Sequence, residues 1–326
     1  MMRWLLAALL LAAPFGAWAQ LESLRLLEDR AVDGIAAGNL SGLAWCDGAL
    51  WALSDREDDR LYRLEAGAIS WLAQVERFAA PPAPASGSPW GLRTVNRVNG
   101  LFRGGQLDFE GLTCDAAGNR YLASETALGV LRLPRIGEPQ WLTLPATLTR
   151  QARASGLLLH FNAGFEGLAI DPAGERLWLA AERQRRGLLQ LRSEQDRWQC
   201  DERCVLLSEG GREQGPAALG GRRQPRDFSA LAWFDDKLFT LERLAHTVCR
   251  RSVQTGAVER CWSFADTALS ETRSYHQPHG TAEALWVDAE GAWIGLDNGG
   301  HARADGDVRP FVWRFAAPVA GWGAAL

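Results

Sequence analysis

One short pattern occurs five times along the chain. Each copy has a serine or glutamate, then glycine or alanine, then leucine within an apolar run. The copies are Leu40–Trp45, Phe109–Cys114, Phe165–Ile170, Phe228–Trp233 and Ala282–Val287. An aspartate-containing turn and a second apolar strand follow each copy, as a β-hairpin requires. A pattern that recurs at such intervals along the chain restricts the fold to an array of similar supersecondary units.

Each interval between copies has room for two more strands after the hairpin. Examples are Arg60–Glu65 with Ser70–Glu76, and Thr247–Val253 with Ala257–Phe264. Four strands per repeat is the composition of a β-propeller blade. The sequence therefore predicts an all-β fold, a β-propeller of five blades with four antiparallel strands in each.

The last repeat shows only three strands, ending with Pro310–Ala316. We expect Leu21–Glu28 to supply the fourth strand, so that the N-terminal strand closes the ring in the last blade. A sixth blade could lie in Phe78–Gly105, but this stretch is rich in proline and glycine, so we interpret it as a surface loop. A β-sandwich with chance similarity between repeats is the alternative fold.

The composition of the 326-residue chain excludes two classes of protein. A hydrophobic fraction of 47% and a net charge of -4 are not those of a disordered chain. The acidic balance offers no basic face for nucleic acid, so we expect no nucleic-acid partner.

The first nineteen residues have the pattern of a secretory signal peptide. Arg3 precedes the apolar run Trp4–Ala13, and Ala17-Trp18-Ala19 matches a cleavage site. An uncleaved anchor is the alternative, although the apolar run is short for a membrane span. We therefore expect residues 1–19 to be removed and residues 20–326 to form one propeller domain. This domain should be periplasmic or secreted and monomeric, with no membrane span.

Six cysteines form an even set, which export permits to pair as disulfides. Cys249 and Cys261 lie at equal distances from a turn, so they should face each other across a hairpin and bond. Cys200 and Cys204 could close a small loop, which leaves Cys46 and Cys114 at similar places in two repeats. A zinc site is the alternative, but paired C-x-x-C motifs are lacking.

The repeat also predicts two rings of side chains at one mouth of the propeller channel. The first residue of each inner strand and the residue that ends the second strand lie at the same end of the hairpin. The inner ring is Ser41, Glu110, Glu166, Ser229 and Glu283. The second ring is Asp55, Glu125, Glu182, Glu242 and Asp297. Crowded carboxylates raise one another's pKa, so this mouth requires compensation.

Two kinds of compensation fit these residue types. Ca²⁺ prefers carboxylate and carbonyl oxygens, and Glu110, Glu166 and Glu283 are its candidate ligands, with Asn39 and Asp108 as helpers. Arginines that follow the strand-end acids could neutralise them or hold an anionic substrate. These arginines are Arg56, Arg183 and Arg243. Alternatively, the acids accept backbone hydrogen bonds from neighbouring blades and have only a structural role.

The repeats carry a family resemblance. The segments concerned are Gly38–Leu43, Leu53–Arg56, Leu107–Leu112, Asn162–Gly174, Leu238–Arg243 and Leu296–Asn298. They resemble the phytase-like domain family, known for esterase-like activity of phytase, and are also similar to the SdiA-regulated domain family of exported propellers. The resemblance implies an exported β-propeller with Ca²⁺ in or near the channel. Ser41 and Ser229 depart from a complete ring of glutamates, so not every blade can supply a carboxylate ligand.

Two functions follow from these observations. The first is a metal-dependent ester or phosphoester hydrolase acting on a small anionic ester, with Glu110, Glu166, Glu283, Arg183 and Arg243 as catalytic candidates. The second is a non-catalytic envelope propeller that binds a small molecule, a glycan or a protein. The sequence contains no G-x-S-x-G motif, so it does not support serine esterase chemistry.

Overall fold

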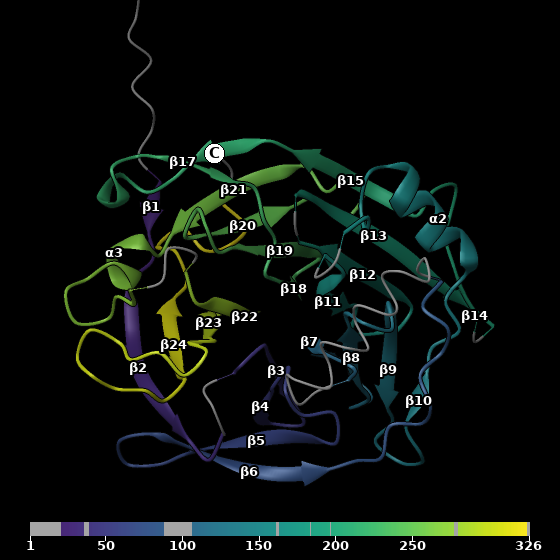
Figure 1. Cartoon of the computed structure of the whole chain (residues 1–326), viewed down its shortest axis with the longest axis horizontal. Coiled ribbons are helices and arrows are strands. Elements are labelled where there is room, and N and C mark those ends of the chain that lie inside the picture. Colours follow the sequence, from purple (N-terminus) through teal and green to yellow (C-terminus); the bar gives the residue numbers. More distant parts are fainter. Residues whose placement is uncertain are drawn as a thin grey trace, which may run out of the picture.

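Five blades of β-strands are arranged in a ring (Figure 1), and pairing of β2 (Leu26–Asp33) with β6 (Trp71–Arg77) joins the last and first blades into one eight-stranded sheet. The computed structural model describes residues 21–35, 39–87, 106–160, 163–182, 184–195, 197–276 and 280–324. The innermost strands are β3 (Gly42–Cys46), β7 (Phe109–Cys114), β11 (Phe165–Ile170), β18 (Ala230–Phe234) and β22 (Ala282–Asp288). Each contacts the next, and β22 contacts β3, so the ring is closed. The predicted five-bladed β-propeller is confirmed.

The remaining strands follow each inner strand outward, and we number the blades in chain order. Blade 1 adds β4 (Ala49–Leu53), β5 (Arg60–Ala66) and β6 (Trp71–Arg77); blade 2 adds β8 (Arg120–Ser124), β9 (Gly129–Leu133) and β10 (Gln140–Trp141). Blade 3 adds β12 (Arg176–Ala181), β13 (Arg185–Glu194), β14 (Arg197–Gln199) and β15 (Val205–Gly210); blade 4 adds β19 (Lys237–Glu242), β20 (Thr247–Arg251) and β21 (Val258–Ser263). Blade 5 adds β23 (Gly291–Leu296), β24 (Phe311–Ala316) and β2 (Leu26–Asp33).

Short elements connect or cover the blades. They are the two-residue strand β1 (Glu22–Ser23), the helices α2 (Ala146–Ala154) and α3 (Ala265–Ala268), the hairpin of β16 (Arg212–Gln214) with β17 (Arg223–Pro225), and the 3₁₀ turn η2 (Ala217–Leu219). Residues 78–87 form no strand. The rest of the stretch considered for a sixth blade, residues 88–105, lies outside the described residues. No helix in the described ranges is long and apolar enough to cross a membrane.

The N-terminal segment closes the ring as predicted, but the closing strand β2 begins at Leu26 rather than at Leu21. β2 pairs antiparallel with β24 and so completes blade 5. The predicted strand Leu21–Glu28 begins too early, because Glu22 and Ser23 pair in parallel with β21 of blade 4. The far end of β2 pairs with β6 of blade 1 through Val32 and Trp71. One short segment therefore ties three blades together.

Small residues in the repeat let the inner strands approach closely. A Cβ atom added to Gly167 of blade 3 would lie 2.7 Å from the backbone nitrogen of Leu231 in blade 4. A Cβ at Gly111 would lie 3.1 Å from the nitrogen of Leu168. A Cβ atom essentially never approaches another atom as closely as 2.7 Å, and 3.1 Å is tighter than most real contacts. The close approach of the inner strands therefore favours glycine in blades 2 and 3, while blades 4 and 5 have alanine at this position.

The hydrophobic core lies between blades rather than within them. Among the described residues the buried apolar side chains form five clusters, and each cluster joins two neighbouring blades. Trp178, Trp262 and Trp313 are almost fully buried in two of these clusters. Since neighbouring blades cover both faces of the inner part of each sheet, strands such as β11 and β23 are buried along their whole length.

The cysteines form three disulfides. Cys249 and Cys261 face each other on β20 and β21, as predicted from their spacing. Cys200 bonds to Cys204. Cys46 bonds to Cys114 and so joins the ends of the inner strands β3 and β7, with a Cα–Cα distance of 6.1 Å.

The close approach of the inner strands generates a prediction. Gly167→Ala should lower the free energy of unfolding by about 1–3 kcal/mol, because the new methyl group overlaps backbone that cannot move independently. Gly323→Ala is the matched control, since nothing lies within 4 Å of its Cβ position. Denaturant unfolding of both variants measures the difference. Equal stability of the two would contradict this explanation of the repeat.

The bond between blades 1 and 2 generates a second prediction. Replacing Cys46 and Cys114 together by serine should cost about 4 kcal/mol, because the bond closes a long loop in the unfolded chain. The loop spans 68 residues, whereas the Cys200–Cys204 loop spans only 4. The Cys200→Ser/Cys204→Ser double variant should therefore lose much less stability in the same unfolding experiment. The reverse order would show that loop closure is not the source of the stabilisation.

Candidate functional site: an acidic channel mouth

Three inner strands begin with a β-bulge, and the extra residue is a glutamate each time. In blade 2, Phe109 pairs with Ser124 and Gly111 with the adjacent Ala123, so Glu110 has no partner of its own in the ladder. Glu166 and Glu283 occupy the same position in blades 3 and 5. A bulge bends the strand and re-aims the side chain of the extra residue.

The two serine blades lack this bulge. The amide of Ser229 donates to the carbonyl of Leu241 in a regular ladder, and its hydroxyl donates to the carbonyl of Ala282 in the next blade, at 2.8 Å. Ser41 has the same backbone bond, to Leu53. Serine at this position therefore belongs to a regular ladder, and in blade 4 its hydroxyl also bonds to the next blade, whereas each glutamate is presented by a bulge. The sequence pattern alone did not reveal this difference.

Three carboxylates converge between blades 1 and 2. Asp55, Asp108 and Glu110 each place one oxygen within 4.8 Å of the others. Asp55 follows β4 of blade 1 and is buried, while the other two come from the start of β7 and are partly buried. We call this group the carboxylate trio. The trio combines Glu110 of the expected inner ring, Asp55 of the expected second ring and Asp108, which was expected to assist in binding Ca²⁺.

The backbone that carries Asp108 is held in an uncommon conformation. Asp108 has a left-handed φ of 53°. The carboxylate of Asp58 accepts hydrogen bonds from the amides of Gln106 and Leu107 at 2.6 and 3.0 Å. The carbonyl of Asp108 accepts from the amide of Glu125 at 2.9 Å. Uncommon backbone that several bonds maintain is typical of a preorganised site.

Burial and mutual repulsion raise the pKa values of three glutamates at this mouth. Burial, followed by the charges of Asp108 and Asp55, raises the pKa of Glu110 well above its usual range. Burial and then Asp108 raise the pKa of Glu125 to about 8. The pKa of Glu166 is also raised well above its usual range, by burial and then by Glu182 and Glu125. The mouth can therefore hold either protons or a cation at neutral pH.

One arginine neutralises the acids on the other side of the mouth. Arg243 donates to Glu182 of blade 3 and to Glu283 of blade 5, and its Nε lies 3.5 Å from Asp227. Its own strand-end neighbour, Glu242, is not among these partners. Arg243 thus links acids from three blades and is engaged by carboxylates rather than open to a substrate anion. Arg183, the other arginine predicted to be catalytic, lies outside the described residues.

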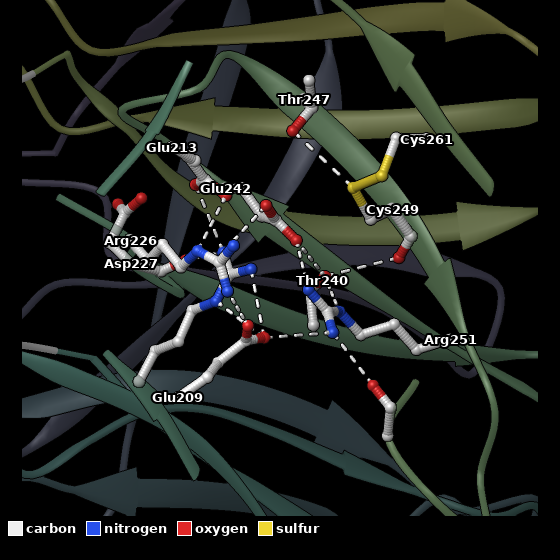
Figure 2. The surroundings of a disulfide bond; sticks show 12 residues. Glu209, Glu213, Arg226, Asp227, Thr240, Glu242, Thr247, Cys249, Arg251 and Cys261 are labelled. Carbon is white, nitrogen blue, oxygen red and sulfur yellow. Dashed lines mark hydrogen bonds and ion pairs between the residues drawn. A yellow bond between two sulfur atoms is a disulfide. The ribbon is translucent and has the colours of Figure 1, made fainter. Parts of the chain in front are cut away.

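Glu242 does not join the second ring at the mouth. Its carboxylate accepts from Arg186 at 2.8 Å and from Arg251 at 2.6 Å, in the interface between blades 3 and 4 (Figure 2). Both guanidinium groups stack on the ring of Phe228, at 4.6 and 4.7 Å. Arginines on β13 and β20 therefore hold this acid between the blades. The sequence could not indicate these partners, which come from strands far apart in the chain.

An open cleft of about 560 Å³ lies beside Arg243 and the acids with which it pairs. Its lining includes Glu182, Asp227, Arg243, Glu283 and Asp297. Burial raises the pKa of Asp297, and Asp297 in turn contributes to the raised pKa of Glu110. The cleft and the carboxylate trio therefore belong to one electrostatically coupled mouth. Four of the five expected second-ring acids lie there: Asp55, Glu125, Glu182 and Asp297.

Comparisons with known proteins match this chain to one family model. The model is described as phytase-like, esterase-like activity of phytase, and it matches residues 35–246, more than half of the chain. A search of curated proteins found no match.

Solved structures resemble the chain only at low identity. Glutaminyl cyclase of Myxococcus xanthus is 11% identical, with a TM-score of 0.49 over 90% of this chain and 97% of that chain. The PQQ-bound aldose sugar dehydrogenase of Streptomyces coelicolor is 13% identical, with a TM-score of 0.44 over 90% and 98%. A streptogramin B lyase structure is 10% identical, with a TM-score of 0.38 over 86% and 66%. Identities this low assign no activity.

The raised pKa values predict how stability depends on pH. In metal-free protein, Glu110, Glu125 and Glu166 have folded-state pKa values above the ordinary 4.5, so the folded state binds more protons than the unfolded state. The stabilisation is complete below the unfolded pKa and is lost as pH rises through the folded pKa. Between pH 6.5 and 8 the melting temperature in chelator should therefore fall.

Glu125→Gln, which is neutral at every pH, should flatten this profile, while the exposed Glu65→Gln should leave it unchanged. Both variants and the parent are melted in chelator at several pH values. A Glu125→Gln profile as steep as the parent's would contradict the assignment.

Proposed function

We propose a function from the premise that this chain belongs to the phytase-like family, described by esterase-like activity of phytase. The proposed function is that of a Ca²⁺-dependent hydrolase, which acts on small anionic esters, phosphoesters included, at the acidic channel mouth. The observation that carries the proposal is the convergence of Asp55, Asp108 and Glu110 from two blades. The separation of these oxygens, their chemistry and the protonated acids beside them all support it.

The carboxylate trio fits a hard divalent cation. Ca²⁺ binds oxygen at about 2.3–2.6 Å, so two ligands of one ion are at most about 5 Å apart. The three oxygens meet this condition. Asn39, buried just before the ring position of blade 1, could add a carbonyl oxygen. The hydroxyl of Ser41 in the same blade is buried with no hydrogen-bond partner among the described residues.

The trio differs from the ligand set expected from the sequence, which was Glu110, Glu166 and Glu283. Glu110 is a member of the trio. Glu283 is paired with Arg243 instead. Glu166 contributes to the same electrostatic cluster but is not one of the three converging carboxylates in the described part of the chain.

The neighbouring acids have separate tasks in this proposal. Bound Ca²⁺ would polarise the ester and lower the pKa of a coordinated water. Burial raises the pKa of Glu166 well above its usual range, which suits this acid to donate a proton to the leaving oxygen. Arg243 pairs with Glu182 and Glu283 and holds both side chains in place, and so serves as a positioning residue.

Export belongs to the same proposal. The N-terminal pattern is that of a cleaved signal, and residues 1–20 lie outside the described part of the structure. The three disulfides are compatible with an oxidising compartment such as the periplasm or the extracellular space. The proposed enzyme would therefore meet its substrate outside the cytoplasm.

One observation favours the second candidate function, a propeller that binds a ligand without turnover. Arg243, which could have held a substrate anion, is fully engaged by acids of three blades. In that case the cation would have a structural role. Turnover measurements separate the two functions.

Metal binding gives the first test. Purified protein should contain Ca²⁺ or take it up in calorimetry, and the melting temperature should rise when Ca²⁺ replaces chelator. Glu110→Gln should lose this rise. In chelator at pH 8, however, Glu110→Gln should be at least as stable as the parent, because the buried carboxyl group has gone. Glu65→Gln should behave like the parent. A Glu110→Gln variant that loses stability equally with and without Ca²⁺ would show a purely structural residue.

Turnover gives the second test. A panel of phosphate and carboxylate esters should be hydrolysed with Ca²⁺ but not with chelator, and Glu166→Gln should reduce kcat about a hundredfold or more. Glu65→Gln is again the control. Ca²⁺ binding without turnover of any ester would support the non-catalytic function.

A further inference from the structure

An apolar hollow of about 240 Å³ lies next to the acidic cleft, between blades 4 and 5. Its walls include Phe264, Ala268 and Leu269 from the segment after β21, Trp313 from β24, and His246 from the turn after β19. Phe264 and Trp313 are about 1% exposed, so their rings form a firm floor. Burial lowers the pKa of His246, which is therefore a neutral ring at neutral pH.

Two observations indicate a binding hollow rather than imperfect packing. Leu219 of η2 lines it and is 38% exposed, which places an apolar side chain at the rim, in contact with solvent. Tyr275 also lines it, and the Tyr275 hydroxyl is buried without a hydrogen-bond partner in the described residues. Native structures seldom leave a buried polar group unsatisfied, and a ligand is one way to satisfy it.

The hollow and the cleft meet at a shared wall. Arg243 and Gly280 line both cavities. Gly280 has φ +69°, and a Cβ there would lie 3.0 Å from Cγ of Arg243, so glycine keeps this wall thin. Arg243 and Gly280 therefore separate two neighbouring cavities, and a molecule that lies over the stem of Arg243 would contact both.

We propose that the hollow binds the aromatic ring of a small ester whose anionic group lies at the mouth. The anionic end rests on the proposed function, because a bound cation is needed to offset the acids there. A cavity of about 150 Å³ holds benzene, so the hollow has room for one ring with a substituent. The lining is mostly apolar, with Arg243, Ser274 and Thr281 among its polar members, and disfavours a ligand that is charged all round, such as an inositol polyphosphate. The substrate class is therefore an aryl ester.

Binding of two phosphonates tests this without any turnover, because their C–P bond is not hydrolysed. Phenylphosphonate and methylphosphonate are titrated calorimetrically into the full mature chain with Ca²⁺. Burying the ring should make phenylphosphonate bind about ten- to a hundredfold more tightly. Equal affinities, or no binding of either at millimolar concentration, would overturn the proposal.

Two variants locate the ring. Ala268→Phe fills the hollow, and Leu219→Asp makes its rim polar. Each should remove the preference for phenylphosphonate while leaving methylphosphonate affinity unchanged. The controls are Ala68→Phe and Ile69→Asp, at exposed sites on the β5–β6 turn of blade 1. Since Leu219 is on the surface, its variant should fold even if Ala268→Phe does not. A preference that survives Leu219→Asp and a folded Ala268→Phe would overturn the assignment of this hollow.

Failure of the proposed function gives a different result. If no Ca²⁺ binds but phenylphosphonate is still preferred and Leu219→Asp removes this preference, the ring site stands and the metal-dependent mechanism fails. If Ca²⁺ binds and esters are hydrolysed without preference for aryl groups, the function stands and the ring site fails.

Discussion

The contact between neighbouring inner strands is the constraint on which the rest of this molecule depends. Five strands surround one channel, and backbone meets backbone at Gly111 and Gly167 with no space for a methyl group. Such an approach fixes the position of the residue just before each glycine, which must lie at the channel mouth. Apolar clusters between the blades then hold the ring at this width. The acidic mouth is thus a consequence of the fold's narrowest dimension, because no other part of a blade brings side chains of all five repeats together.

Charge accumulates at this mouth because each blade contributes at the same level. The structure answers the repulsion in two ways, on two sides of the channel. Between blades 3, 4 and 5, Arg243 supplies a fixed positive charge to Glu182, Asp227 and Glu283. Between blades 1 and 2, Arg56 pairs with Asp55 at 3.1 Å, and the raised pKa of Glu110 favours the uncharged form of that acid. The second side carries the three converging carboxylates, whereas on the first side Arg243 already pairs with the acids, which is why we assign chemistry to the second and positioning to the first.

Much of the fold could be predicted from the sequence, because the repeat is periodic and hairpin spacing is local. The blade number, the closing strand and the Cys249–Cys261 bond all followed from positions near one another in the chain. The site was predicted less completely. The bulges at Glu110 and Glu283 and the left-handed backbone of Asp108 depend on hydrogen bonds made after folding. Glu242 does not lie at the mouth because it pairs with Arg186 and Arg251. The repeat pattern does not predict the positions of these two arginines.

The serines divide the ring into unlike parts, and this division organises the proposed chemistry. Ser41 and Ser229 begin regular strands in blades 1 and 4, so each serine blade withholds a carboxylate. Beside blade 1, that omission leaves Asp55 to meet the bulged Glu110 of blade 2. In blade 4, Ser229 contributes no carboxylate, and Arg243 of this blade pairs with Glu283 of blade 5. The side chain of the same arginine also lines the apolar hollow. The departure from five-fold symmetry therefore gives the mouth two unlike sides, one with three converging carboxylates and one where Arg243 pairs with acids of neighbouring blades, and our two proposals rest on this difference.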